Sequence, residues 1–255
     1  EDVIKIAIVG KPNAGKSSIV NRLLGYERVI VSNIAGTTRD AIDTELTVGG
    51  DKYVLIDTAG IRKKKAIGED LERYSVMRSF LAVRRADVAV IVCDAAEGMT
   101  EQDVKIAGYV HEQGKPSLIV MNKWDLVDKD SHTIEKFEKK LREDLKFMDY
   151  FKSLYISAMT GKRAETILPA CRLVLANSRR RISTGLLNEV LQDAIRISEP
   201  PSRLGKRLKI FYITEVSVTP PTFVIKVNDP ELMHFSYKTV SYTHLRAHET
   251  SQDLV

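Results

Sequence analysis

The stretch that decides the fold reads GKPNAGKS and occupies residues 10–17. It fits the pattern G-x-x-x-x-G-K-[S/T], in which glycines let backbone N–H groups wrap around phosphates at the positive end of a helix. An apolar run at 5–9 precedes it and helical spacing at 17–24 follows it, which is the context that the pattern requires. In such a loop Lys16 contacts the β- and γ-phosphates and the Ser17 hydroxyl binds Mg²⁺. We therefore expect the phosphate-binding residues to be Gly10, Lys11, Pro12, Asn13, Ala14, Gly15, Lys16 and Ser17.

The composition is that of an ordinary globular chain. Its 255 residues are 44% hydrophobic and 29% charged, with a net charge of +5, which excludes collagen-like, disordered and disulfide-scaffold classes. No apolar run reaches the ~18 residues of a membrane span, and the longest, at 86–93, contains Asp87. Two cysteines, Cys93 and Cys171, in a chain that opens without an export signal predict reduced thiols and a cytoplasmic location.

Apolar runs and helical spacings alternate through residues 1–176. Strands are expected at 5–9, 53–56, 86–93, 116–121 and 154–156, and helices at 17–24, 70–83, 100–111, 133–147 and 164–176. Because the strand runs are continuously apolar, we expect an α/β fold with a doubly wound, mainly parallel sheet covered on both faces. After Asn177 the pattern changes, and a helix at 184–197 with strands at 208–216 and 222–227 predicts a smaller α+β domain.

Three further motifs follow predicted strands, at the edge of the sheet where such folds bind ligands. The carboxylate of Asp57 can hold Mg²⁺, and the Gly60 N–H can contact a γ-phosphate. The Asp125 carboxylate can accept from both the N1–H and the 2-amino group of guanine, which adenine lacks, and a backbone N–H at Ser157 or Ala158 can meet guanine O6. The expected contacts of this guanine-nucleotide site are Asp57, Thr58, Ala59, Gly60, Ile61, Asn122, Lys123, Trp124, Asp125, Ser157 and Ala158.

Together these motifs resemble the P-loop GTPases, and GTTRD at 36–40 resembles switch I of the subgroup that contains Era, TrmE and Der. The resemblance implies hydrolysis of GTP to GDP, with Thr38 joining Ser17 and Asp57 as Mg²⁺ ligands. It assigns catalytic roles to Lys16, Thr38, Gly60 and Asn13.

Two residues, Ile61 and Asn13, depart from the Ras pattern and bear on mechanism. Ile61 stands where Ras-type proteins carry a water-orienting Gln, and it cannot form a side-chain hydrogen bond. In the resembled subgroup an Asn at the place of Asn13 helps to hold K⁺, with backbone carbonyls of Ser32 and Ile34 closing over it. Such a cation can stabilise developing charge as an arginine finger does. The alternative is that Asn13 only shapes the loop.

The residues after 177 limit the resemblance to one group within these GTPases. RRRISTGLLN at 179–188, PPSRLGKR at 200–207 and the segment 208–238 resemble the KH-like domain that follows the second GTPase domain in the Der (EngA) family. The resemblance implies a GTPase domain at 1–176 and a C-terminally truncated KH-like domain at 177–239, with a further N-terminal GTPase domain in the intact protein. It implies the large (50S) ribosomal subunit or its rRNA as partner, and neither a membrane nor DNA.

Direct RNA contact by the KH-like domain stays one of two alternatives, beside docking on protein. The G-x-x-G loop of nucleic-acid-binding KH domains is absent, because the stretch that begins at Gly205 reads GKRL.

The last sixteen residues, VSYTHLRAHETSQDLV at 240–255, show no apolar period. They resemble a translated sequencing-library adapter, so we expect them not to be natural protein.

Two other functions remain open. Ile61 motivates a non-catalytic, GTP-dependent RNA- or ribosome-binding module. A TrmE-type tRNA-modification GTPase is less favoured, because neither the helical domain nor the Cys-bearing tail of that family is seen.

Overall fold

The computed structural model describes residues 3–26, 29–35, 42–58, 61, 69–148, 151–197, 199–200, 202–203, 205–218 and 222–233. The chain divides into two compact units, Glu1–Asn177 and Ser178–Val255. Three predicted site residues, Thr38, Ala59 and Gly60, lie outside the described residues, as does the predicted adapter tail at 240–255.

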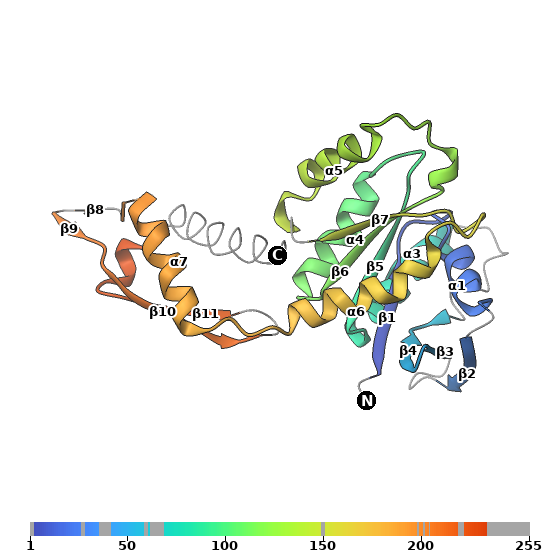
Figure 1. Ribbon diagram of the computed structural model, residues 1–255, viewed down its shortest axis with the longest axis horizontal. Coiled ribbons are helices and arrows are strands. Elements are labelled where there is room, and N and C mark those ends of the chain that lie inside the picture. The colour runs from blue at the N-terminus through green and yellow to red at the C-terminus, as the bar shows by residue number, and fades with distance from the viewer. Residues whose placement is uncertain are drawn as a thin grey trace. The chain divides into compact units, whose positions relative to one another are not determined.

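The first unit is built around one seven-stranded sheet (Figure 1). Its elements are β1 (Ile4–Val9), α1 (Lys16–Leu24), β2 (Val29–Ala35), β3 (Ile42–Val48), β4 (Asp51–Leu55), α3 (Glu69–Arg85), β5 (Val88–Asp94), α4 (Glu101–Glu112), β6 (Ser117–Asn122), η1 (Trp124–Leu126), α5 (Thr133–Asp144), η2 (Lys146–Met148), β7 (Lys152–Tyr155), η3 (Ala164–Thr166) and α6 (Ile167–Ser178). The strand order is β2-β3-β4-β1-β5-β6-β7, and the neighbours from β4 to β7 pair in parallel. The predicted doubly wound, mainly parallel sheet is confirmed.

Two strands of this sheet were not predicted. β2 and β3 pair antiparallel with each other, and β3 pairs antiparallel with β4. β3 reads IDTELTV, with three polar residues in a row at 43–45, and the edge strand β2 exposes Ile30 to 76%. Neither strand presents the continuous apolar run that marks a strand buried on both faces, so the criterion that found β5 and β6 missed them.

Both faces of the sheet are covered, as the alternation of side chains along a strand requires. On one face Ile6 and Ile8 of β1 join a cluster with residues of α1 and α6. On the other, Ala7 and Val9 join a cluster with residues of α3, α4 and α5. Every residue of β5 and β6 is buried, which keeps the carboxyl ends of the central strands at fixed positions.

The second unit is a small α+β arrangement. Its elements are α7 (Thr184–Ile197), β8 (Ser202–Arg203), β9 (Lys206–Arg207), β10 (Ile210–Ser217), β11 (Thr222–Val227) and η4 (Pro230–Leu232). The residues of α7 that are buried recur at helical spacing, and Leu187 and Leu191 pack on Ile213 of the antiparallel β10–β11 pair. The sequence predicts little cover for four apolar residues of these strands, Phe211, Ile213, Phe223 and Ile225. This prediction is wrong for Ile213, which is fully buried, and Phe223 and Ile225 pack partly buried against the same cluster, whereas Phe211 is 55% exposed.

Candidate functional site

The loop at 10–17 needs glycine at two places. Gly10 has φ +150, and a Cβ there would lie 2.3 Å from the carbonyl oxygen of Val92. Gly15 has φ +98, and a Cβ there would lie 2.0 Å from Nδ2 of Asn122. Neither separation is possible for real atoms, so the loop can approach the ends of β5 and β6 only with glycine at both positions.

The ammonium group of Lys16 is enclosed by this loop. Its Nζ donates to the carbonyl oxygens of Gly10 at 2.6 Å and Lys11 at 2.5 Å, and the residue is only 7% exposed. Its hydrogen-bonding groups are all donors. A buried cation at the N-terminus of α1 fits an anionic ligand such as a phosphate chain.

Asn122 joins the phosphate loop to the loop after β7. Its Nδ2 donates to the carbonyl oxygen of Ala14, and its Oδ1 accepts from the backbone N–H of Ala158, each at 3.0 Å. Trp124, two residues after Asn122, donates its backbone N–H to the carbonyl oxygen of Ile156 at 3.0 Å. Three segments distant in sequence are thereby brought together. Ser157 is buried, whereas Asp125 is exposed, so its carboxylate can accept from a ligand.

Arg22 strengthens this junction and was not predicted. From α1 its Nε donates to the carbonyl oxygen of Ala158 at 3.1 Å, and its Nη2 donates to that of Met159 at 2.5 Å. The helix that begins in the phosphate loop therefore also holds the expected guanine-contacting loop. No motif marks Arg22, because an Arg two turns along a helix has no sequence signature.

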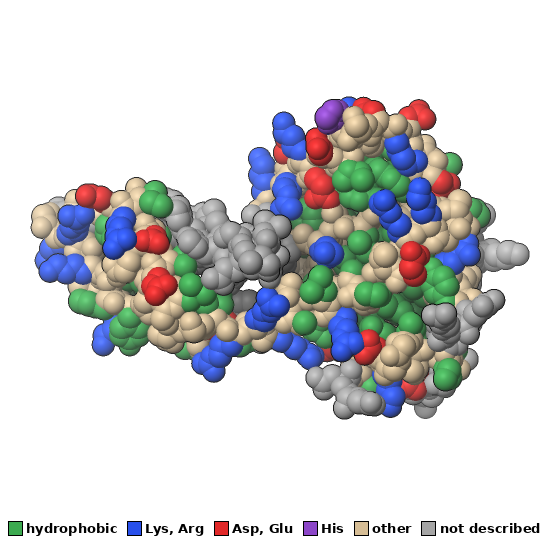
Figure 2. Space-filling view, viewed as in Figure 1, with side chains coloured by type: hydrophobic (Ala, Val, Ile, Leu, Met, Phe, Trp, Pro, Cys, Tyr) green, Lys and Arg blue, Asp and Glu red, His purple; other side chains and the backbone are tan. Residues whose placement is uncertain are grey.

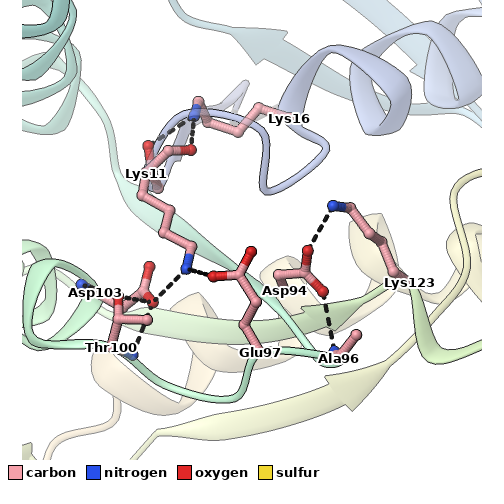
Figure 3. A network of polar contacts seen from close by, with 9 residues as sticks. Lys11, Lys16, Asp94, Ala96, Glu97, Thr100, Asp103 and Lys123 are labelled. Atoms are coloured by element: carbon pink, nitrogen blue, oxygen red, sulfur yellow. Dashed lines mark hydrogen bonds and ion pairs between the residues drawn. The ribbon is translucent and has the colours of Figure 1, made fainter. Parts of the chain in front are cut away.

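An acidic segment between β5 and α4 holds two cations of the site (Figure 3). Lys11 Nζ lies 2.5 Å from a Glu97 carboxylate oxygen and 3.9 Å from Asp103, which is fully buried. Burial opposes its charge, but the Glu97 and Asp103 carboxylates outweigh that effect and raise the pKa of Lys11. Lys123, at φ +60, donates to Asp94 Oδ2 at 2.5 Å.

The start of α4 is closed by a capping box. The Thr100 hydroxyl accepts from the backbone N–H of Asp103, and the Asp103 carboxylate accepts from the backbone N–H of Thr100. These two hydrogen bonds also fix the carboxylate that faces Lys11.

The predicted Mg²⁺ ligands Ser17 and Asp57 lie on neighbouring elements. Ser17 follows β1 at the start of α1, and Asp57 follows β4, which is paired in parallel with β1. The Ser17 hydroxyl donates to the carbonyl oxygen of Ile61 at 2.6 Å, so the phosphate helix is tied to the segment after Asp57. A hydroxyl and a carboxylate are oxygen ligands of the kind that Mg²⁺ prefers, with phosphate oxygens and waters completing its shell. Among the described residues no group of three or more His, Cys, Asp and Glu is placed to hold a metal ion.

The remaining predicted residues are placed as follows. Ile61 is partly buried and packs against the core cluster of α1 and α6. Ser32 and Ile34 lie on the edge strand β2, opposite Glu45 and Asp43 of β3. Their grouping with Asn13 around K⁺ stays a prediction. In the described part of the chain no helix is long and apolar enough to cross a membrane.

Comparison with known proteins gives two family matches. Residues 5–123 match a family described as a 50S ribosome-binding GTPase, and residues 181–249 match the KH-domain-like C-terminal region of EngA bacterial GTPase enzymes. Over 237 residues the chain is 56% identical to GTPase Der of Alkaliphilus oremlandii, which covers 93% of the chain and 54% of that relative. The chain thus spans about half the length of the curated relatives it matches.

Solved structures agree on the fold. Era from Aquifex aeolicus, bound to GDP and AlF4⁻, is 20% identical with a TM-score of 0.52 and covers 97% of this chain and 88% of its own. A second Era structure, in complex with MgGDPNP and nucleotides 1506–1542 of 16S ribosomal RNA, is 21% identical with a TM-score of 0.51 and covers 96% and 87%. The predicted P-loop GTPase fold followed by a KH-like domain is confirmed, and the chain has proteins named GTPase Der as homologues.

Proposed function

We propose that this chain binds guanine nucleotides with Mg²⁺ and hydrolyses GTP to GDP and phosphate. The observation that supports this most is the double hydrogen bond of Asn122, which holds the phosphate loop and the Ala158 loop together beside the exposed Asp125 carboxylate. Such a junction suits a ligand with a phosphate chain at one end and a guanine base at the other.

Each part of the site then has a chemical task. The loop amides and the Lys16 ammonium bind the phosphates, and Asp125 selects guanine through its N1–H and 2-amino groups. Ser17, Asp57 and Thr38 would hold Mg²⁺, which neutralises phosphate charge when bound. The Gly60 N–H would contact the γ-phosphate, so that GTP orders the segments at 36–40 and 60–65 and GDP releases them.

The proposal includes K⁺ as the activating ion. Ile61 packs on the core and offers no side-chain hydrogen bond to an attacking water. A cation held by Asn13 and the backbone carbonyls of Ser32 and Ile34 would supply charge stabilisation in its place.

We further propose that the chain acts in biogenesis of the large (50S) ribosomal subunit in the cytoplasm, as the second GTPase domain and KH-like domain of a Der-like protein. Support comes from the names of its relatives and from charge, since residues 176–239 carry ten Lys and Arg against six Asp and Glu. Figure 2 shows several of the Lys and Arg side chains on the visible face of the second unit. A positive surface of this kind suits rRNA phosphates.

The test is GTP turnover in K⁺ and in Na⁺ buffers, with wild type, Asn13→Ala and the control Asn21→Ala, which removes an exposed Asn from α1. We expect K⁺ to stimulate turnover about tenfold or more, with the stimulation lost only in Asn13→Ala. Tight GTP binding with equal, near-zero turnover in both salts would instead favour the non-catalytic binding module that Ile61 motivates.

A further inference from the structure

A buried carboxylate on β3 links the segment after β4 to the end of α3. Asp43 is on β3, five residues after Thr38, and its side chain is 9% exposed. Its Oδ1 accepts from the backbone N–H of Asp57 at 2.9 Å, and its Oδ2 pairs with the guanidinium of Arg85, the last residue of α3. One side chain of β3 therefore contacts both Asp57, which follows β4, and the last residue of α3.

Asp57, which donates its N–H to Asp43, has an unfavourable backbone conformation. Asp57 has φ +54, in the left-handed region that residues with a Cβ adopt at a cost in energy. Such conformations persist where surrounding contacts impose them, and they cluster at functional sites. The hydrogen bond from the Asp57 N–H to Asp43 is a contact of this kind.

The next residues in each segment repeat the connection. The Thr44 and Thr58 hydroxyl oxygens lie 2.7 Å apart, and both residues are buried. β3 thus holds two consecutive residues at the end of β4 through side chains, beyond the backbone pairing of Thr44 with Leu55. The direction in which the Asp57 side chain leaves the backbone is set from β3.

We propose that Asp43, oriented by its ion pair with Arg85, is a positioning residue that fixes the backbone of Asp57 and so aims the Asp57 carboxylate at Mg²⁺. The inference rests on the proposed function, because it presumes the Mg²⁺–nucleotide complex. A buried ion pair is weak evidence for stability, since desolvation offsets much of its attraction. The role of this ion pair is instead to hold the backbone conformation of one Mg²⁺ ligand, Asp57.

Four variants separate positioning from simple loss of charge. Asp43→Ala removes the acceptor for the Asp57 N–H, whereas Asp43→Asn retains an acceptor oxygen of nearly the same geometry. Arg85→Met leaves the carboxylate but removes the group that orients it. The matched control is Asp51→Ala, which breaks the ion pair between Asp51, on the neighbouring strand β4, and Arg172 of α6, outside the site.

The measurement is the rate of GDP release as Mg²⁺ is varied, followed with a fluorescent GDP, together with hydrogen exchange at the Asp57 amide. In Asp43→Ala we expect the Mg²⁺ concentration that half-maximally slows release to rise about tenfold, as loss of a charge-assisted hydrogen bond predicts. Release in EDTA should stay unchanged and the Asp57 amide should lose protection. Asp43→Asn and Asp51→Ala should stay within about threefold of wild type in Mg²⁺ dependence.

Three results would overturn the inference. They are an unchanged Mg²⁺ dependence in Asp43→Ala, an equal acceleration of release in EDTA, or a shift in Asp51→Ala as large as in Asp43→Ala. Should Asp43→Ala fail to fold, Arg85→Met decides, with about a threefold shift expected and no shift contradicting the proposal. Wild type that binds no GDP at all would refute the proposed function and this inference with it, whereas normal wild-type binding with a null result in the variants refutes the inference alone.

Discussion

Replacing Gly15 with alanine should break the junction between the phosphate loop and the guanine-contacting loop. The new Cβ would lie 2.0 Å from Asn122 Nδ2, so the amide must move away. Asn122 would then lose its bonds to the Ala14 carbonyl and the Ala158 N–H, each now 3.0 Å long and buried. Each buried group left unsatisfied costs about 1–3 kcal/mol, and the left-handed φ costs an alanine about 1 kcal/mol more. We expect a loss of about 3–5 kcal/mol in the free energy of unfolding.

The control shares the backbone conformation without the close contact. Gly50 has φ +94, against φ +98 for Gly15, and a Cβ there would meet nothing within 4 Å. Gly50→Ala should therefore lose only about 1 kcal/mol. The assay is urea unfolding followed by the fluorescence of Trp124, the one tryptophan of the chain, which lies in the first unit. A Gly15→Ala variant as stable as Gly50→Ala would refute the reasoning.

Three further predictions concern other contacts. Lys11→Met leaves the buried Asp103 carboxylate without its cation and should lower the free energy of unfolding in urea by about 2 kcal/mol. Glu97→Gln changes the exposed partner of Lys11 and should lower it by under about 1 kcal/mol. Equal losses in the two variants would contradict this prediction. Burial raises the pKa of Cys171 from 9.0 to about 12. Between these pH values the unfolded chain loses the thiol proton while the folded chain keeps it, so the free energy of unfolding should fall about 1 kcal/mol from pH 9 to pH 10. Cys171→Ala should lack this decrease, and identical pH profiles for wild type and Cys171→Ala would count against the prediction. Asn188 bonds both the N–H and the carbonyl oxygen of Ile213 at 3.0 Å. Asn188→Ala should lower only the earlier of two calorimetric transitions, and one cooperative transition for the whole chain would argue against independent units.

Most of the sheet was predictable because β5 and β6 are apolar at nearly every position, which only burial on both faces explains. β2 and β3 were not, since an exposed edge strand and its polar neighbour carry no such run. Ile213 was misjudged because its cover comes from α7, and helix-to-sheet packing cannot be read from the strand alone.

The candidate site shows a similar division. The motif residues from Gly10 to Ala158 were found because their chemistry requires particular side chains at fixed spacing. The residues that hold them in place were missed, among them Arg22 and Asp43. Their roles depend on which carbonyl or N–H the fold brings within reach, so an Arg on a helix or an Asp on a strand looks the same in sequence with or without such a role.

The claim that this site binds a guanine nucleotide is tested most directly by the affinities of GDP and ADP for wild type and for Asp125→Ala. Asp125 is exposed, so its removal leaves the fold intact. Two hydrogen bonds to a carboxylate predict that wild type prefers GDP by at least about a hundredfold, and that Asp125→Ala loses most of this preference. Equal affinity of wild type for GDP and ADP, or an unchanged preference in Asp125→Ala, would contradict the account.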